Sequence, residues 1–170
     1  AGVDRPAADY LSLNTYNLTA PTITDPSLYF DIRLWQGNDG TTTINDMGFS
    51  PDLMWIKNRD STYDHAWYDT IRGNTAMLSS SETDGSDPSY GDVESQTTGF
   101  EIDSGYSRLN ESPDNYVGWL WGAGGAASSN SDGTNTSALV SVSTTAGFSI
   151  VKYTGTGASA TVGHGLTKTP

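Results

Sequence analysis

The side chains that could carry out chemistry in this chain are few and scattered. It has two histidines, His65 and His164, and no cysteine, which excludes disulfides and thiolate metal sites. His65 follows Asp64 and could act as a base oriented by a carboxylate, but no serine occupies a Gly-x-Ser-x-Gly elbow that such a base would activate. The 20 acidic residues leave a glycosidase pair arithmetically open, although the sequence gives no separation between carboxylates. We predict no catalytic residues and no enzymatic activity.

The aromatic side chains are better candidates for a binding surface. Five tryptophans are available, and an apolar ring suits the C–H face of a sugar. Trp119 and Trp121 lie two residues apart and so share one strand face, which we expect in the core. Trp67 and Tyr68 follow a polar stretch and are the more exposed pair, with burial in the core as the alternative. The predicted ligand-binding residues are Tyr63, His65, Trp67 and Tyr68.

Oxygen-rich turns are candidate calcium sites. The segments 38–40, 84–87 and 130–133 combine Asp or Asn with Gly or Ser, and Ca²⁺ prefers such oxygen ligands. None has the complete D-x-[DN]-x-[DN]-G loop with a closing Glu, so each is better explained as a plain turn. We therefore predict no cofactor, keep Ca²⁺ as an alternative, and leave any metal-binding residues open.

Short strands joined by tight turns must position these residues. Aromatic residues, at 11%, favour half-buried strands together with Thr and Val, while Gly, Asn, Asp and Ser supply turns. The turn signal at 38–40 predicts a type I′ turn into a short return strand, and the apolar run 53–57 suits a central strand covered on both faces. We expect strands at 30–35, 41–44, 53–57, 65–69, 76–78, 99–102, 116–121, 139–142 and 148–153.

No stretch keeps a helical period over three turns. The predicted fold is therefore all-β: antiparallel β-sandwich modules, of jelly-roll or concanavalin-like type, arranged in tandem with few or no helices.

The end of the chain restarts a pattern found near its beginning. The spacing Phe-x-Ile-x-x-Trp-x-Gly from Phe30 recurs as Phe-x-Ile-x-x-Tyr-x-Gly from Phe148. Either this is a tandem repeat, or it is the likeness that any two hairpins punctuated by glycine share. The repeat predicts four parts: 1–28 as the end of an upstream β domain plus linker, 29–122 as a complete β-sandwich module, 123–140 as a Gly/Ser/Asn-rich linker and strand, and 141–170 as the first hairpin of a second, truncated repeat.

The charge balance narrows the range of partners. The formal net charge is −12, which disfavours nucleic acid because binding it relies on neutralising phosphates with Lys and Arg. No apolar run of 18 residues is present, so we predict no membrane insertion. An acidic surface is compatible with solubility alone and with neutral or cationic ligands such as glycans.

Three runs of the sequence resemble a known family. They are GFSPDLMWIKNR at 48–59, NYVGWLWGAGG at 115–125 and TTAGFSIVKYTGTG at 144–157. They are similar to an uncharacterised repeat module of tail-fibre-like structural proteins of tailed bacteriophages, notably phages of marine and freshwater bacteria. The resemblance covers 29–170, and residues 1–24 resemble the end of the concanavalin-like domain that often precedes the module. No catalytic residues come with it.

The resemblance implies a virion structural protein: a tail fibre, or a surface fibre or adhesin, that contacts the host cell surface, with a glycan as one candidate ligand. It implies a location at the virion surface, outside the cell. The implied partners are further copies of the chain, as the homotrimer expected of fibres, other virion proteins, and a host-surface glycan or protein. Two alternatives stay open: a non-binding structural spacer or capsid-attached fibre of a phage, and a subunit of an extracellular bacterial filament.

Overall fold

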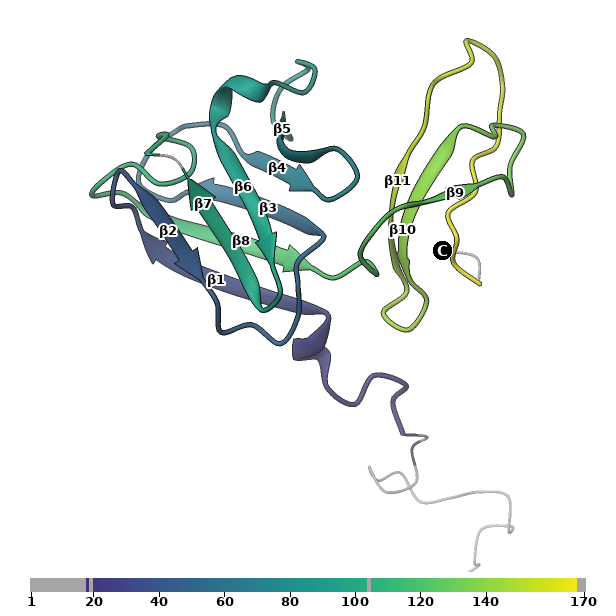
Figure 1. Ribbon diagram of the computed structural model, residues 1–170, viewed down its shortest axis with the longest axis horizontal. Coiled ribbons are helices and arrows are strands. Elements are labelled where there is room, and N and C mark those ends of the chain that lie inside the picture. The colour runs from purple at the N-terminus through teal and green to yellow at the C-terminus, as the bar shows by residue number, and fades with distance from the viewer. Residues whose placement is uncertain (1–17, 19, 104, 168–170) are drawn as a thin grey trace, which may run out of the picture.

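Strands dominate the chain, and they form three antiparallel sheets (Figure 1). The computed structural model describes residues 18, 20–103 and 105–167. Within these residues the helical elements are two short 3-10 turns, η2 (Pro26–Leu28) and η3 (Pro88–Tyr90). The predicted all-β fold with antiparallel sheets and few or no helices is confirmed.

The largest sheet has five strands, and all of its neighbouring strands run antiparallel. In spatial order they are β1 (Phe30–Gln36), β8 (Asn115–Trp121), β3 (Leu53–Asn58), β4 (Ala66–Asp69) and β5 (Gly73–Ser79). The strand β3 lies in the middle, as its run of apolar residues predicts. The edges of this sheet are therefore β1 and β5.

A second sheet covers the inner face of the first and completes a β-sandwich. Its strands, in spatial order, are β2 (Thr41–Ile44), β7 (Gly99–Asp103) and β6 (Asp92–Gln96). Large side chains from both sheets fill the space between them, and Tyr68, Phe100 and Tyr116 are fully buried there. Such interdigitation of two inner faces is the usual way in which paired sheets form one core.

The predicted hairpin at 30–44 is wrong, although both of its strands exist. The strand β2 does not return along β1 but pairs with β7 in the second sheet. The backbone carbonyl of Asn110 accepts the N–H groups of Asn38 (3.2 Å) and Asp39 (3.0 Å). A distant part of the chain therefore holds this turn, which carries the chain from one sheet to the other.

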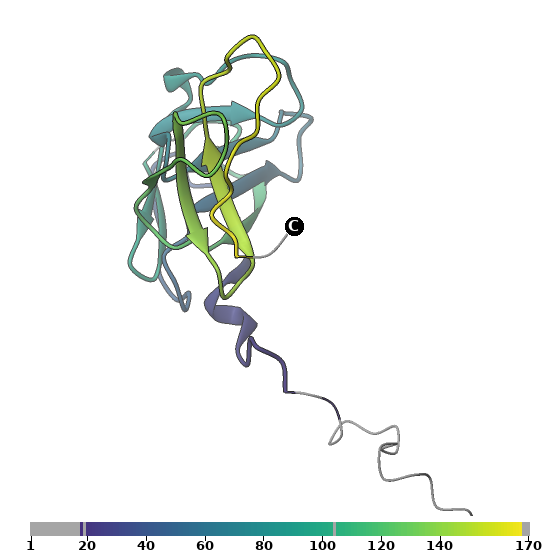
Figure 2. The ribbon, with the colours of Figure 1, turned by 90° about the vertical axis from the view of Figure 1, so that its right-hand side faces the viewer.

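The third sheet lies beside the sandwich, at the end where β8 leaves it (Figures 1 and 2). Its strands, in spatial order, are β11 (Phe148–Lys152), β10 (Ala138–Ser143) and β9 (Ser128–Asn130). The ring of Phe148 stacks on that of Trp121, with 6.1 Å between the centroids. This contact joins the third sheet to the outer face of the five-stranded sheet.

A buried carboxylate fixes the junction between the sandwich and the third sheet. Asp52, 4% exposed, accepts hydrogen bonds from the backbone N–H of Ala123 (2.7 Å) and of Gly125 (3.0 Å). The hydroxyl of Ser141, on β10, donates to the carbonyls of the same two residues, at 3.1 and 2.6 Å. The chain that leaves β8 is therefore held on both sides.

The tryptophans of β8 do not face the sandwich core, so that expectation was wrong. Tyr116 and Leu120 are buried in the core, while Trp119 and Trp121 occupy the alternate positions on the outer face. Successive strand residues point to opposite faces, and in β8 both sets are apolar. Alternation alone could not say which set the second sheet would cover.

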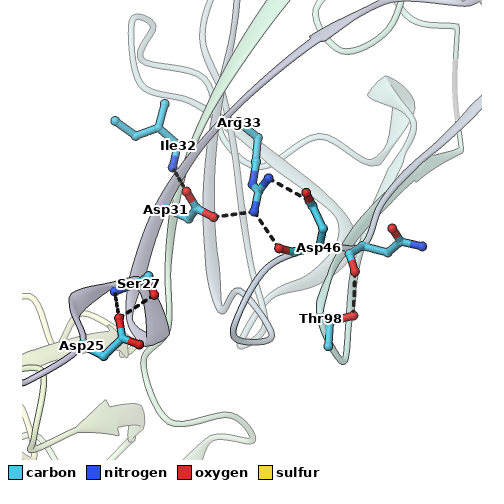
Figure 3. A network of polar contacts seen from close by, with 8 residues as sticks. Asp25, Ser27, Asp31, Ile32, Arg33, Asp46 and Thr98 are labelled. Carbon is cyan, nitrogen blue, oxygen red and sulfur yellow. Dashed lines mark hydrogen bonds and ion pairs between the residues drawn. The ribbon is translucent and has the colours of Figure 1, made fainter.

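The edge strand β1 places Asp31, Arg33 and Trp35 inward and Phe30, Ile32 and Leu34 outward. On the inner side, Arg33 lies between Asp31 and Asp46, at 2.8 Å from each carboxylate (Figure 3). Trp35 stacks on Tyr116, with ring centroids 5.6 Å apart. The outward residues Phe30, Ile32 and Leu34 are apolar and exposed, as described below.

The predicted division into parts stays a prediction. Most of 1–28 lies outside the described residues, which include η2 from that part. The strand β9 falls in the predicted linker 123–140, and β10, at 138–143, crosses the predicted boundary after residue 140.

Candidate functional site

The outer face of the five-stranded sheet carries a row of tryptophans. Register places Trp119 of β8 opposite Trp55 of β3, and Trp55 opposite Trp67 of β4. The row is continued by Ile32 of β1 at one end and Leu78 of β5 at the other. We call Trp119, Trp55 and Trp67 the tryptophan row. It spans the central strands and is the most aromatic surface of this sheet.

The indoles of the tryptophan row pack against one another at an angle. The centroids of Trp55 and Trp119 are 5.2 Å apart with their planes at 45°, and those of Trp55 and Trp67 are 5.6 Å apart at 66°. Aromatic pairs prefer such tilted arrangements. The row is consequently a ridged apolar surface, and it does not offer one flat plate.

His65 is tied to the tryptophan row. The Trp55 Nε1–H donates to His65 Nδ1 at 2.8 Å, so a neutral His65 carries its proton on Nε2. Burial lowers the pKa of His65, and the positive charge of Lys57 acts in the same direction, while Asp64 opposes both. His65 is therefore neutral near pH 7, and it acts as a hydrogen-bond acceptor in this structure.

Asp64 is occupied by other partners. It accepts from the Ser81 hydroxyl at 2.9 Å and forms an ion pair with Arg108 at 3.1 Å. The Ser81 hydrogen bond is the largest cause of the lowered pKa of Asp64. The Asp64–His65 neighbourhood seen in the sequence is thus divided between two networks.

Only part of the predicted ligand-binding set meets in space. Trp67 lies on the outer face and His65 joins it through Trp55, while Tyr63 is 40% exposed in the loop before β4. The prediction that Tyr68 is exposed beside Trp67 is wrong, because adjacent strand residues face opposite ways. Tyr68 is fully buried, its hydroxyl donates to the Gly91 carbonyl at 3.0 Å, and burial raises its pKa.

Two members of the aromatic surface were missed from the sequence. Trp119 was expected in the core, and Trp55 was placed only in a strand covered on both faces. The cross-strand register that puts these two residues opposite one another is not visible in a single sequence. The signal that could have revealed them is that 53–57 and 116–121 carry large apolar side chains at both sets of alternate positions, and so on both faces of each strand. Strands that are apolar on both faces need a cover on both.

A groove of about 490 Å³ lies between the outer face and β11. Its floor is formed by Leu53, Trp67 and Leu78, and residues 148–153 form the opposite wall. Trp67 Nε1 is buried and has no hydrogen-bond partner among the described residues. Buried indole donors usually find a partner, so this N–H is an unused donor beneath the groove floor.

An ion pair gives this groove a fixed polar edge. Arg72 Nε lies 2.6 Å from Asp69 Oδ2, and Arg72 also donates to the carbonyls of Trp67 and Ala76. Asp69 in turn accepts from the backbone N–H of Ile71 at 3.1 Å. Both side chains are therefore held in place before any ligand arrives.

The oxygen-rich turns are occupied by the chain itself. Asp39 accepts from the Ser112 N–H at 2.8 Å, and Asp87 accepts from the Ser89 N–H at the same distance. Across residues 18, 20–103 and 105–167, no group of three or more His, Cys, Asp or Glu could hold a metal ion. No helix in that part of the chain is long and apolar enough to cross a membrane.

The fold defines an antiparallel β-sandwich domain with a side sheet, and with an aromatic groove between that sheet and the sandwich. The chain belongs to the family of a domain of unknown function, DUF7483, which matches residues 25–170. That match includes every strand described above. Comparison with curated proteins and with solved structures gave no match.

Proposed function

We propose that this chain is a non-catalytic adhesive module of a fibre at a virion surface, and that the groove between the outer face and β11 holds a host glycan. The observation that carries the proposal is the groove itself, with Trp67 in its floor and the Asp69–Arg72 pair at its edge. The location at a virion rests on the resemblance of 29–170 to tail-fibre-like proteins of bacteriophages.

The size and lining of the groove suit a short saccharide. Ligand sites commonly measure about 300–1,000 Å³ and combine an apolar lining with a few fixed polar groups, and this groove has about 490 Å³. The indole of Trp67 suits the C–H face of a sugar, while Asp69 and Arg72 suit its hydroxyl groups.

The charge of the chain selects among glycans. With a net charge of −12, the protein repels polyanionic saccharides at long range. Tyr153, 56% exposed, and Lys152 stand at the β11 side of the groove. Because of the long-range repulsion by the net charge of −12, we expect neutral glycans to bind better than sulfated or uronic polymers of the same length.

The second candidate function is that of a non-binding structural spacer. The tilted indoles of the tryptophan row favour it, because a ridged apolar surface suits another protein surface better than a sugar ring. On this view the groove is the unfilled margin of a packing surface.

A glycan array probed with the intact chain separates the two functions. Binding of neutral glycans, weakened about tenfold by Tyr153→Ala or by Trp67→Ala, is the expected result, since losing one aromatic contact of about 1.4 kcal/mol has that effect. The matched control is Leu139→Ala, an exposed residue of β10 that does not line the groove. Absence of binding to any glycan, with or without added Ca²⁺, would leave the spacer function standing.

The non-catalytic part of the proposal has its own test. Polysaccharides that the chain binds are incubated with it, and reducing ends are counted over time. We expect no release of sugar. A steady release of reducing ends that stops after the chain is denatured by heat would contradict the proposal.

A further inference from the structure

An apolar strip lies exposed along β1, at the side of the outer face away from the groove. Its members are Phe30, Ile32 and Leu34, which are 37%, 48% and 64% exposed. We call these three residues the β1 strip. They occupy alternate positions of one strand and therefore point the same way. Three large apolar side chains in one exposed line are more than the isolated surface hydrophobics of an ordinary domain.

The β1 strip continues a surface on which the chain already packs. The ring of Phe30 lies 5.1 Å from that of Trp121, and Trp121 stacks on Phe148 of the third sheet. The same face is thus covered by the chain's own β11 at one end and uncovered along β1. Another sheet packed on the β1 strip would make the same kind of apolar contact that β11 already makes with this face.

Charge on this part of the face is unusual for so acidic a chain. The outward positions of β1, β8 and β3 are Phe30, Ile32, Leu34, Gln36, Asn115, Val117, Trp119, Trp121, Leu53, Trp55 and Lys57. They include no carboxylate, although the chain has 20 acidic residues and a net charge of −12. Two copies that met elsewhere would bring acidic surfaces together, whereas two copies that meet here would not.

The backbone edge of β1 is protected while its face is left open. The Ile32 N–H donates to the carboxylate of Asp31 at 2.7 Å. Arg33 forms ion pairs with both Asp31 and Asp46 beside this edge strand (Figure 3). Charged groups at a sheet edge oppose the addition of another strand. The contact that the strand can make is consequently through its side chains, face to face.

We infer that a second copy of this chain packs its β1 strip against the β1 strip of the first. A sugar is the poorer occupant, because the strip offers no hydrogen-bonding side chain for hydroxyl groups. An anionic membrane is the poorer occupant because the rest of the chain is acidic. The contact leaves the groove free, because Phe30, Ile32 and Leu34 are not among the residues that line it. It therefore goes beyond the adhesive function and does not depend on it.

Molar mass measured across a concentration series tests the inference. The full chain, of 18.1 kDa, is followed by sedimentation velocity and light scattering. We expect the mass to rise above that of one chain with concentration, and Leu34→Glu to weaken association by about tenfold or more. The matched control, Leu139→Glu, makes the same change at a strand residue 36% exposed on the third sheet and should associate like the parent.

A cross-linking experiment locates the contact directly. Because the chain has no cysteine, Ile32→Cys supplies one thiol and Leu139→Cys supplies a control thiol. A short bis-maleimide should give covalent dimers with Ile32→Cys and few with Leu139→Cys. The inference is overturned if the parent chain stays single at every concentration, if Leu34→Glu associates like the parent, or if the two cysteine variants cross-link equally.

The adhesive function and the copy contact fail separately. Glycan binding is measured on Leu34→Glu, and association is measured on Tyr153→Ala. We expect each variant to lose only its own property. If Leu34→Glu lost both while keeping its circular dichroism and melting temperature, the strip would belong to the glycan site, and the copy contact would be overturned.

Discussion

Removing the carboxylate of Asp52 should loosen the junction between the sandwich and the third sheet. Asp52 is 4% exposed and accepts from the N–H groups of Ala123 and Gly125 at 2.7 and 3.0 Å. Asp52→Ala removes Oδ2, the single oxygen that accepts both N–H groups. The Ala123 N–H then remains buried without a partner, since Ala123 itself is fully buried.

The size of the effect follows from those two bonds. A hydrogen bond to a charged group contributes about 1.5–3 kcal/mol, and the bond to Gly125 counts toward the lower end because it is only partly buried. We expect Asp52→Ala to lower the free energy of unfolding by about 3 kcal/mol. For a chain of this size that corresponds to a melting temperature lowered by roughly 6–12 °C.

Two measurements check this together. Denaturant unfolding gives the loss of free energy, and hydrogen exchange followed by NMR shows whether the amides of Ala123 and Gly125 exchange faster. Asp52→Asn can place its carbonyl oxygen where Oδ2 lies and so keep both bonds; it should lose about half as much, because a bond to a neutral acceptor contributes about half of one to a charged group. Asp46→Ala is the matched control, because its side chain is 74% exposed and such surface pairs contribute about 1 kcal/mol or less.

Either of two results would contradict this role of Asp52. One is a loss below about 1 kcal/mol for Asp52→Ala, no greater than that of the control. The other is unchanged exchange at Ala123 and Gly125, which would mean that the junction is held by other contacts.

Three further predictions concern the sandwich. Acid should break the hydrogen bond between Trp55 and His65. Burial lowers the pKa of His65 in the folded chain. The stability that comes from the neutral ring is therefore complete above the ordinary pKa of 6.5 and is lost as the pH falls through the lowered pKa of the folded state. The Trp55 indole resonance reports this in an NMR titration, and a pH-independent resonance would contradict it. Gly118→Ala should lower the free energy of chemical unfolding by about 1–3 kcal/mol, because a methyl group there would lie 3.2 Å from the Trp35 ring. The control Gly85→Ala, where a methyl group meets open space, should leave the stability unchanged. Equal losses for the two variants would contradict the close packing at Gly118. Arg33→Ala should cost about 1–2 kcal/mol in low salt, because its partner Asp46 is 74% exposed while the Arg33 side chain itself is only 24% exposed. Added salt should shrink the difference, and a loss that does not change with salt would contradict an ion-pair contribution.

Much of the strand pattern could be predicted from single elements. The run 53–57 is apolar at every position but its last, so its place in the middle of a sheet follows from the sequence. Gly118 between Val117 and Trp119 marks a strand position without a side chain, and the structure fills that space with Trp35. These features depend on local chemistry, which the sequence carries.

The pairing of strands and the choice of core face could not be predicted. The strand at 41–44 was expected to return along its predecessor, but the bonds of Asn38 and Asp39 to Asn110 arise from a residue about seventy positions away. Trp119 and Tyr116 are both acceptable core residues, and only the position of the second sheet decides between them. The same ambiguity explains why exposure and burial in the core both stayed open for Trp67 and Tyr68.

The ligand-binding groove is tested most directly by the indole N–H resonances of the five tryptophans. Trp67 Nε1 has no partner among the described residues, while Trp35 Nε1 donates to the Leu109 carbonyl at 3.2 Å and serves as an internal control. On titration with a neutral oligosaccharide chosen from the glycan array, the Trp67 resonance should move and saturate while that of Trp35 stays fixed. A Trp67 resonance that does not move as binding saturates, or all five moving alike, would contradict a glycan site in this groove.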